Sequence, residues 1–147
     1  MKVWLQRVTE ASVEIDGASV AQIGTGYLAL LGVGVGDTPS AAEALAARAV
    51  HLRVFEDESG KINKSVQDVA GEILVVSQFT LYADTAHGRR PGFSNAARPE
   101  VAEPLYEHFV ACLRRLLGPS RVQTGRFGAY MKVRLLNDGP FSVELLA

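Results

Sequence analysis

The chain has 147 residues, with 15 basic and 16 acidic side chains and a formal net charge of −1 at pH 7. This length suits one domain that folds without disulfide or metal support, and we expect a single domain over residues 1–147. The near-neutral charge excludes a strongly basic nucleic-acid binder, so a nucleic-acid partner would have to meet a local basic patch.

Cysteine content and hydropathy bear on the cellular compartment of the protein. The lone cysteine, Cys112, excludes an internal disulfide and fits a reducing environment. Residues 1–15 lack the apolar core of a signal peptide, because Gln6 and Arg7 interrupt it. No apolar run reaches the roughly 18 residues of a membrane span. We therefore expect a cytoplasmic protein with no membrane partner.

The first third of the chain predicts strands. Residues 13–15 enter a tight turn at Asp16-Gly17, a pair that suits a type I′ hairpin, and residues 20–23 return. Residues 27–33 form a continuous apolar run, which is typical of a strand covered on both faces.

Two later segments have helical periodicity. Thr38 is a capping residue and Pro39 suits the first helical position, so a helix is expected to begin there. In the second segment, Pro104 is expected in the first helical turn or at the true start, and Gly118-Pro119 ends the helix. The apolar residues that share one face are Ala42, Leu45, Ala49 and Leu52 in the first helix, and Val101, Leu105, Phe109, Cys112 and Leu116 in the second.

The remaining segments complete an α+β pattern. Residues 56–66 read as a polar loop, residues 72–82 as a buried strand, and residues 83–99 as a loop of 17 residues, a length usual for functional or disordered loops. The order of elements predicts one α+β domain with a largely antiparallel or mixed sheet and two main helices. Three short strands are expected after the second helix, near 122–124, 129–136 and 141–146.

Two segments suggest cofactor sites that the spacing does not support. The stretch GVGVGD, residues 32–37, would need a third glycine where Asp37 stands to match a dinucleotide fingerprint. We interpret it as a flexible strand exit, with a nucleotide-binding enzyme as an alternative. The three histidines are far apart in sequence, and a metal site needs several converging ligands, so we expect neither metal nor cofactor.

Positive charge gathers in the long loop. His87, Arg89, Arg90 and Arg98 fall within 12 residues, and guanidinium groups suit phosphates. The alternative is a solvated loop without a partner. A phosphodiester ligand therefore stays open despite the net charge.

The end of the buried strand offers polar groups that could line a pocket. Ser77, Gln78 and Thr80 follow the apolar run, and side chains with free backbone amides at a strand end suit a binding site. The alternative is a strand that simply emerges into water. A threonine nucleophile needs a base in reach, and this segment supplies none.

Several motifs, in one order along the chain, resemble those of D-aminoacyl-tRNA deacylases. They are SQFTLYAD (Ser77–Asp84), GRRPGF (Gly88–Phe93), QTGRFGA (Gln123–Ala129) and NDGP (Asn137–Pro140), with further likeness in QRVTEASVEIDG and LRVFEDESGKINKSV. The resemblance covers residues 1–146. It implies a homodimeric α+β enzyme that hydrolyses the ester between a D-amino acid and the 3′ end of tRNA. It also implies cleavage of glycine mischarged on tRNA-Ala.

The second family motif is only partly kept. Asn137 to Pro140 match it, but Phe141 and Ser142 stand where the family commonly has valine and threonine. The serine keeps a hydroxyl, whereas the phenylalanine is much larger. Family members also commonly have aspartate where Tyr130 stands, so the resemblance gives Tyr130 no role.

The resemblance implies roles for one group of residues near the partner subunit. A cis Gly139–Pro140 peptide would enter the partner's pocket and aim two carbonyl oxygens at the substrate's α-ammonium. Arg7 would brace this dipeptide, and Asn137 belongs to the same substrate-binding set. An L side chain would then point into protein backbone, whereas glycine would escape exclusion.

A second group would perform the hydrolysis. Resemblance places the backbone amides of Phe79 and Thr80 at the ester carbonyl, where N–H donors stabilise developing negative charge. Ser77 and Gln78 would shape the adenosine end of the site. Thr80 could attack or could position water, and we favour positioning, with help from the ribose 2′-hydroxyl. The rival hypothesis is a non-catalytic RNA-binding module.

Overall fold

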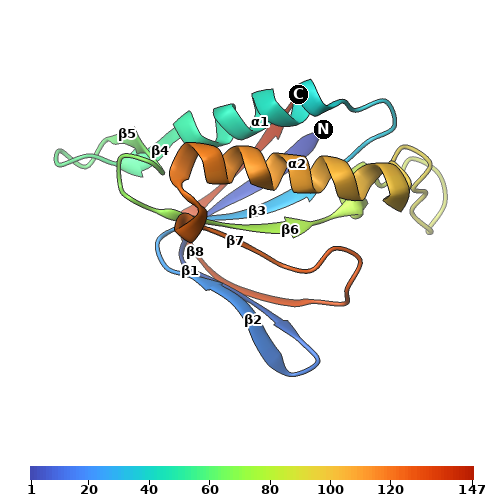
Figure 1. Cartoon of the computed structure of the whole chain (residues 1–147), viewed down its shortest axis with the longest axis horizontal. Helices are drawn as coiled ribbons and strands as arrows, with labels where there is room; N and C mark the ends of the chain where they lie inside the picture. The colour runs from blue at the N-terminus through green and yellow to red at the C-terminus, as the bar shows by residue number, and fades with distance from the viewer.

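A mixed six-stranded sheet carries two helices on one face, as Figure 1 shows. The computed structural model describes residues 1–147. The sheet consists of β1 (Lys2–Ile15), β2 (Ala18–Ile23), β3 (Gly26–Gly32), β6 (Glu72–Ser77), β7 (Val122–Thr124) and β8 (Lys132–Leu146). The helices are α1 (Pro39–His51) and α2 (Pro99–Leu117). This arrangement confirms the predicted α+β class with a mixed sheet and two main helices.

Strand β1 organises the sheet because it is paired on both sides. Its first half pairs with β3 and its second half with β2, all antiparallel. Its other side pairs with β8 along almost its full length. Beyond β3, strands β6 and β7 are added in parallel. Strand β8 therefore has only β1 as a neighbour and leaves one edge of the sheet open.

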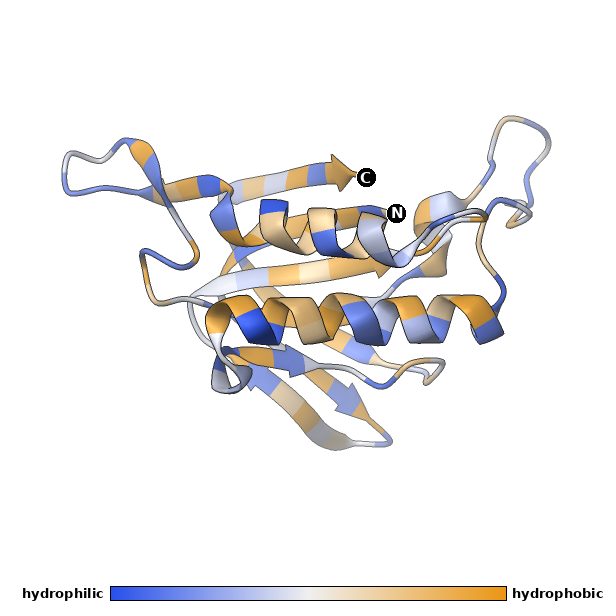
Figure 2. Ribbon diagram, turned by 45° about the horizontal axis from the view of Figure 1, so that its top comes forward, coloured by the Kyte–Doolittle hydropathy of each residue, from blue (hydrophilic) through white to orange (hydrophobic).

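Apolar residues cover both faces of the sheet. The larger cluster lies between the sheet and the helices, and the smaller one lies on the opposite face. In β3, Tyr27 and Leu31 belong to the larger cluster and Leu28 to the smaller one, which confirms the prediction of a strand buried on both sides. Figure 2 shows polar and apolar residues alternating along both helices, as expected of helices that bury one side.

The local signals for α1 and for the first hairpin are confirmed. The Thr38 side chain accepts a hydrogen bond from the Ala41 N–H at 3.3 Å, and Pro39 is the first helical residue. Asp16 and Gly17 have φ values of 51° and 80°, which a type I′ turn requires. None of the helices is both long and apolar enough to cross a lipid bilayer.

Two predictions away from the site were wrong. Helix α2 begins at Pro99, so Pro104 lies inside it, where proline removes one backbone hydrogen bond. The predicted loop at residues 56–66 is largely a hairpin of β4 (Arg53–Glu56) and β5 (Ile62–Ser65). These strands were not predicted because many of their residues are polar, which is possible since the hairpin lies outside the main sheet.

Two strand predictions near the site also needed correction. The predicted strand over residues 72–82 ends at Ser77, and the 3₁₀ helix η1 (Phe79–Tyr82) follows it. A further short 3₁₀ turn, η2 (Pro119–Arg121), lies between α2 and β7. The strands expected near 129–136 and 141–146 are one strand, β8, because pairing with β1 resumes on both sides of the Gly-Pro sequence.

Candidate active site

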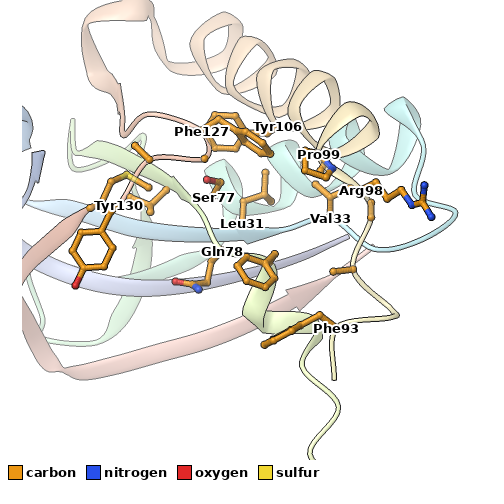
Figure 3. A pocket seen from close by; sticks show the side chains of 18 of the residues that line it. Leu31, Val33, Ser77, Gln78, Phe93, Arg98, Pro99, Tyr106, Phe127 and Tyr130 are labelled. Carbon is orange, nitrogen blue, oxygen red and sulfur yellow. The ribbon is translucent and has the colours of Figure 1, made fainter. Parts of the chain in front are cut away.

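An apolar pocket of about 640 Å³ opens where β6 ends. Its floor comes from β3 and β6, one wall from the first turns of α2, and the other from the segment between β7 and β8, as Figure 3 shows. Fourteen of its 19 lining residues are hydrophobic. A concave, mostly apolar site with a few polar groups is typical of small-molecule binding.

The polar groups of the pocket come from the turn between β6 and η1. Ser77 and Gln78 are half-buried in the pocket wall, and the Phe79 ring is 57% exposed beside them. The Gln78 N–H donates to the Leu31 carbonyl at 2.8 Å, which extends the β3–β6 pairing by one residue. The Gln78 side-chain amide also donates to the Thr80 hydroxyl. The sheet thus fixes the position of this turn.

The first backbone N–H groups of η1 have no hydrogen-bond acceptor within the 3₁₀ turn. A 3₁₀ helix bonds each N–H to the carbonyl three residues earlier, and here the first such bond runs from Leu81 to Gln78 at 3.3 Å. The N–H groups of Phe79 and Thr80 precede that bond. They are therefore the donors that a bound carbonyl oxygen could use.

The glycine-rich segment, residues 32–37, packs against η1. The Asp37 carboxylate accepts hydrogen bonds from the Gly34 N–H at 2.6 Å and from the Tyr82 hydroxyl at 3.4 Å. Burial, followed by the nearby Asp37 charge, raises the pKa of Tyr82 to about 12. A Cβ on Gly34 would lie 2.5 Å from the Tyr82 ring, so a larger residue there would displace that ring. This contact gives the segment a packing role.

The arginine-containing loop is attached to the pocket through Phe93. The Phe93 ring meets the Phe79 ring edge-on, with centroids 4.9 Å apart. Asp84 and Gly92 exchange two backbone hydrogen bonds of 2.8 Å each and close the base of the loop. The loop tip, with Arg89 and Arg90, extends beyond this closure, past the N-terminal end of α2 (Figure 1).

The second group of predicted residues forms a bulge in β8. Gln6 pairs with Ser142 and Val8 with Asn137, so four residues of β8 lie opposite Arg7 alone. The Asn137 side chain spans the bulge: its oxygen accepts from the Phe141 N–H at 2.7 Å and its nitrogen donates to the Ser142 hydroxyl at 3.1 Å. Ser142 therefore supplies the hydroxyl oxygen that accepts the hydrogen bond from the Asn137 side chain.

The Arg7 side chain fixes the position of the bulge through hydrogen bonds and packing. Its guanidinium is buried, donates to the Asp138 carbonyl at 3.0 Å and to the Val54 carbonyl at 2.6 Å, and lies over the Phe141 ring at 5.1 Å. The Phe141 ring is partly buried and packs against the larger core cluster. Gly139 and Pro140 are exposed at the tip, and the peptide bond between them is cis.

One chain does not bring the two groups together. Ser77, Gln78 and Phe79 line the pocket, whereas Thr80 and the bulge residues do not. The bulge residues in question are Arg7, Asn137, Gly139 and Pro140. The bulge also lies on β8, at the open edge of the sheet, and β1 and β3 separate it from β6.

Several pocket residues were not predicted from the sequence. Tyr106 and Phe127 meet with ring centroids 5.7 Å apart, and the Tyr106 hydroxyl donates to the Val75 carbonyl at 3.0 Å. Burial raises the pKa of Tyr106 to about 12. Tyr130 lines the same pocket with 88% of its surface exposed. Tyr106 was not predicted as a pocket residue because it lies within an amphipathic helix. No local pattern marked Phe127 or Tyr130, which follow β7, as pocket residues.

Comparisons with known proteins agree on one family. The family described as D-Tyr-tRNA(Tyr) deacylase matches residues 4–146. A protein of Thermomicrobium roseum named D-aminoacyl-tRNA deacylase is 56% identical over 145 residues, which cover 99% of this chain and 93% of that protein. One of Roseiflexus castenholzii with the same name is 54% identical, covering 99% and 91%.

Solved structures agree with these sequence matches. A structure titled c-Myc DNA Unwinding Element Binding Protein superposes with a TM-score of 0.96 and 45% identity, over 100% of this chain and 99% of that one. A second structure, of a probable eukaryotic D-amino acid tRNA deacylase, has a TM-score of 0.82 at 20% identity and shows likeness of fold alone.

Proposed function

This chain belongs to the D-Tyr-tRNA(Tyr) deacylase family, and we propose that it cleaves the ester bond that joins a D-amino acid to the 3′ end of tRNA. The products are free D-amino acid and tRNA, and the site of action would be the cytoplasm. The observation that carries this proposal is the family match over residues 4–146, and it is supported by Ser77, Gln78 and Phe79 at the pocket.

The pocket is proposed to hold the terminal adenosine of the tRNA. Its apolar lining suits a nucleobase, and the aromatic rings of Tyr106 and Phe127 stand in its wall. The polar side chains of Ser77 and Gln78 would meet the ribose at the mouth. The ester carbonyl would then lie near the start of η1.

Negative charge on the carbonyl oxygen would be stabilised by the main chain. The N–H groups of Phe79 and Thr80 precede the first hydrogen bond of η1 and are fixed by the sheet through Gln78. Preorganised donors of this kind contribute roughly 3–4 kcal/mol each to the transition state. Water would attack the carbonyl carbon, and the ester oxygen would leave with a proton as the ribose hydroxyl.

Thr80 is proposed to position substrate and water rather than attack. Its hydroxyl already accepts a hydrogen bond from the Gln78 amide, and no histidine, lysine or carboxylate lines the pocket as a base. Thr80→Ala should therefore keep single-turnover hydrolysis of D-tyrosyl-tRNA within about 100-fold of the wild type, the low end of the range for a positioned group. Complete loss of hydrolysis with unchanged tRNA binding would identify Thr80 as the nucleophile instead.

The Gly139–Pro140 bulge is proposed to act in the pocket of a second copy. Strand β8 has an open edge 15 residues long, and such an edge is a ready template for another chain. Apolar side chains are exposed along it, with Leu135 at 37%, Leu136 at 57% and Leu146 at 51%. A symmetric dimer would give each pocket a bulge that its own chain cannot supply.

Stereochemical choice would then follow from exclusion. Two carbonyl oxygens at the bulge would hold the α-ammonium while the η1 amides hold the ester, which leaves one direction for the side chain. An L side chain would point into backbone, and a D side chain would point to solvent. Glycine has no side chain to exclude, so glycine mischarged on tRNA-Ala should be cleaved, and D-amino acids should be cleaved with little preference among them.

The decisive experiment compares matched charged tRNAs. D-tyrosyl-tRNA should be hydrolysed at least about 100-fold faster than L-tyrosyl-tRNA, since misplacing the ester by about 1 Å costs that much. Light scattering of the same sample should give a dimer mass. Equal hydrolysis of both esters would overturn the stereochemical mechanism, and tRNA binding without hydrolysis of either would favour the non-catalytic RNA-binding module.

A further inference from the structure

Basic residues are concentrated around the pocket although the chain as a whole is almost neutral. Residues 85–99 contain three arginines and no acidic residue. Residues 108–137 contain no acidic residue either. These two segments supply opposite walls of the pocket. No acidic residue lines the pocket, although Asp84, Glu100 and Glu107 flank the two segments in sequence.

Four arginines in these segments define what we call the basic rim: Arg89, Arg90, Arg98 and Arg126. Arg98 lines the pocket at the start of α2, and Figure 3 shows its side chain directed outward from the end opposite Tyr130. Arg126 directly precedes Phe127 in the other wall. Arg89 and Arg90 lie in the loop whose base is fixed beside Phe93.

The basic rim has no acidic partner within the chain. None of its four guanidiniums takes part in any of the ion pairs, and all four residues are exposed. Arg7 and Arg134 are paired with Asp138 and Glu14, whereas Arg114 and Arg115 also lack an ion pair but lie in the last turn of α2. Unpaired like charges repel one another, so a cluster of them around a pocket favours an anionic ligand there.

Exposed aromatic rings accompany these charges. Phe79, Phe93 and Tyr130 line the pocket with 57%, 37% and 88% of their surfaces exposed. A basic surface with exposed aromatic rings is typical of sites for single-stranded nucleic acid, where guanidiniums meet phosphates and rings stack on bases. An acidic peptide would satisfy the charges and leave the rings without a function.

We propose that the basic rim binds the phosphates of the single-stranded RNA segment that precedes the terminal nucleoside. The inference rests on the proposed function, because it places that nucleoside in the pocket. From there the 5′ phosphate of the nucleoside and those before it leave through the mouth, where the rim arginines stand. The rim thus sets affinity for the tRNA chain, while the pocket and η1 act on the ester.

The test compares two substrates that share one ester. The double variant Arg89→Ala/Arg90→Ala is assayed on D-tyrosyl-tRNA and on the D-tyrosyl ester of adenosine, which has no phosphate. On the tRNA, KM should rise about 10-fold at low salt with kcat unchanged, because a phosphate contact is the same in ground and transition states. On the adenosine ester, both constants should match the wild type.

Salt dependence gives a second readout. Each phosphate contact on a single strand contributes about 0.7 to the slope of log KM against log salt, so the double variant should lower that slope by about 1.4. Arg126→Ala, on the opposite wall, should lower it by about 0.7.

The matched control is Arg114→Ala/Arg115→Ala in the last turn of α2. It removes the same charge about 20 Å from the pocket end of the helix and should leave KM and slope unchanged.

The outcomes separate the two proposals. Equal losses on both substrates would mean that the loop only supports the pocket, and would overturn the inference. An unchanged KM and salt slope on tRNA would overturn it as well. Failure of the wild type to cleave either D-tyrosyl ester would instead overturn the proposed function.

Discussion

Gly139→Ala should lower the single-turnover rate on D-tyrosyl-tRNA by about 100-fold, the cost of a misplacement of about 1 Å at a reacting centre. Gly139 has a φ of +134°, a conformation that L side chains rarely adopt. A Cβ there would lie 3.1 Å from the Phe141 N and 3.2 Å from Arg7 Nη2. The bulge would have to shift, and its carbonyl oxygens would no longer point as they do in the native chain.

A matched glycine separates this effect from general strain. Gly17 also has a positive φ, of +80°, but a Cβ there would meet nothing within 4 Å. Gly17→Ala, at the tip of the β1–β2 turn, should cost some stability and leave the hydrolysis rate unchanged. If folded Gly139→Ala kept a rate within about threefold of the wild type, the bulge would have no part in catalysis.

Arg7→Met should lower the free energy of unfolding by about 2–3 kcal/mol, since the buried Val54 carbonyl and the partly buried Asp138 carbonyl both lose a charged donor. Arg7 is 7% exposed, and its guanidinium bridges the Val54 and Asp138 carbonyls. Methionine keeps the apolar stem but cannot donate. Urea denaturation at one fixed protein concentration measures the change, because association would otherwise shift the midpoint.

An exposed arginine provides the comparison for Arg7. The Arg134 side chain is 75% exposed and lies 3.6 Å from a Glu14 oxygen. Arg134→Met should change the unfolding free energy by less than about 1 kcal/mol, as is usual for surface ion pairs. Equal effects of the two substitutions would mean that the Arg7 hydrogen bonds contribute little, and that the bulge is held by Asn137 and packing alone.

The parts of the fold with a clear period were predictable. Thr38 and Pro39 fixed the start of α1, and Asp16-Gly17 fixed the first hairpin. The end of β6 was not predictable, because Phe79 to Tyr82 are as apolar as the strand before them and only the register with β3 decides where pairing stops. The bulge in β8 was not predicted because Gly139-Pro140 is a local turn signal, whereas pairing with β1 makes the residues on both sides of it one strand.

The candidate site was predictable only where one short motif contains it. Ser77, Gln78 and Phe79 are contiguous, and both the polar end of the strand and the resemblance pointed to that segment, whereas resemblance alone pointed to Asn137–Pro140. The pocket walls are assembled from separate elements, and a helical stripe looks the same whether Tyr106 faces a core or a cavity. Exposure of Tyr130 depends on the path of the segment after β7, which no local pattern specifies.

The packing of Gly34 beneath Tyr82 bears on how mutational damage should be distributed. Donors carried by the main chain of η1 are not deleted by changing a side chain, except by a substitution to proline, so most substitutions within the turn itself would leave them in place. Substitutions that impair function should instead include residues that fix the position of the turn, such as Gly34, where an added Cβ would lie 2.5 Å from the Tyr82 ring and would displace it. Gly34 would then be sensitive to substitution although it does not line the pocket.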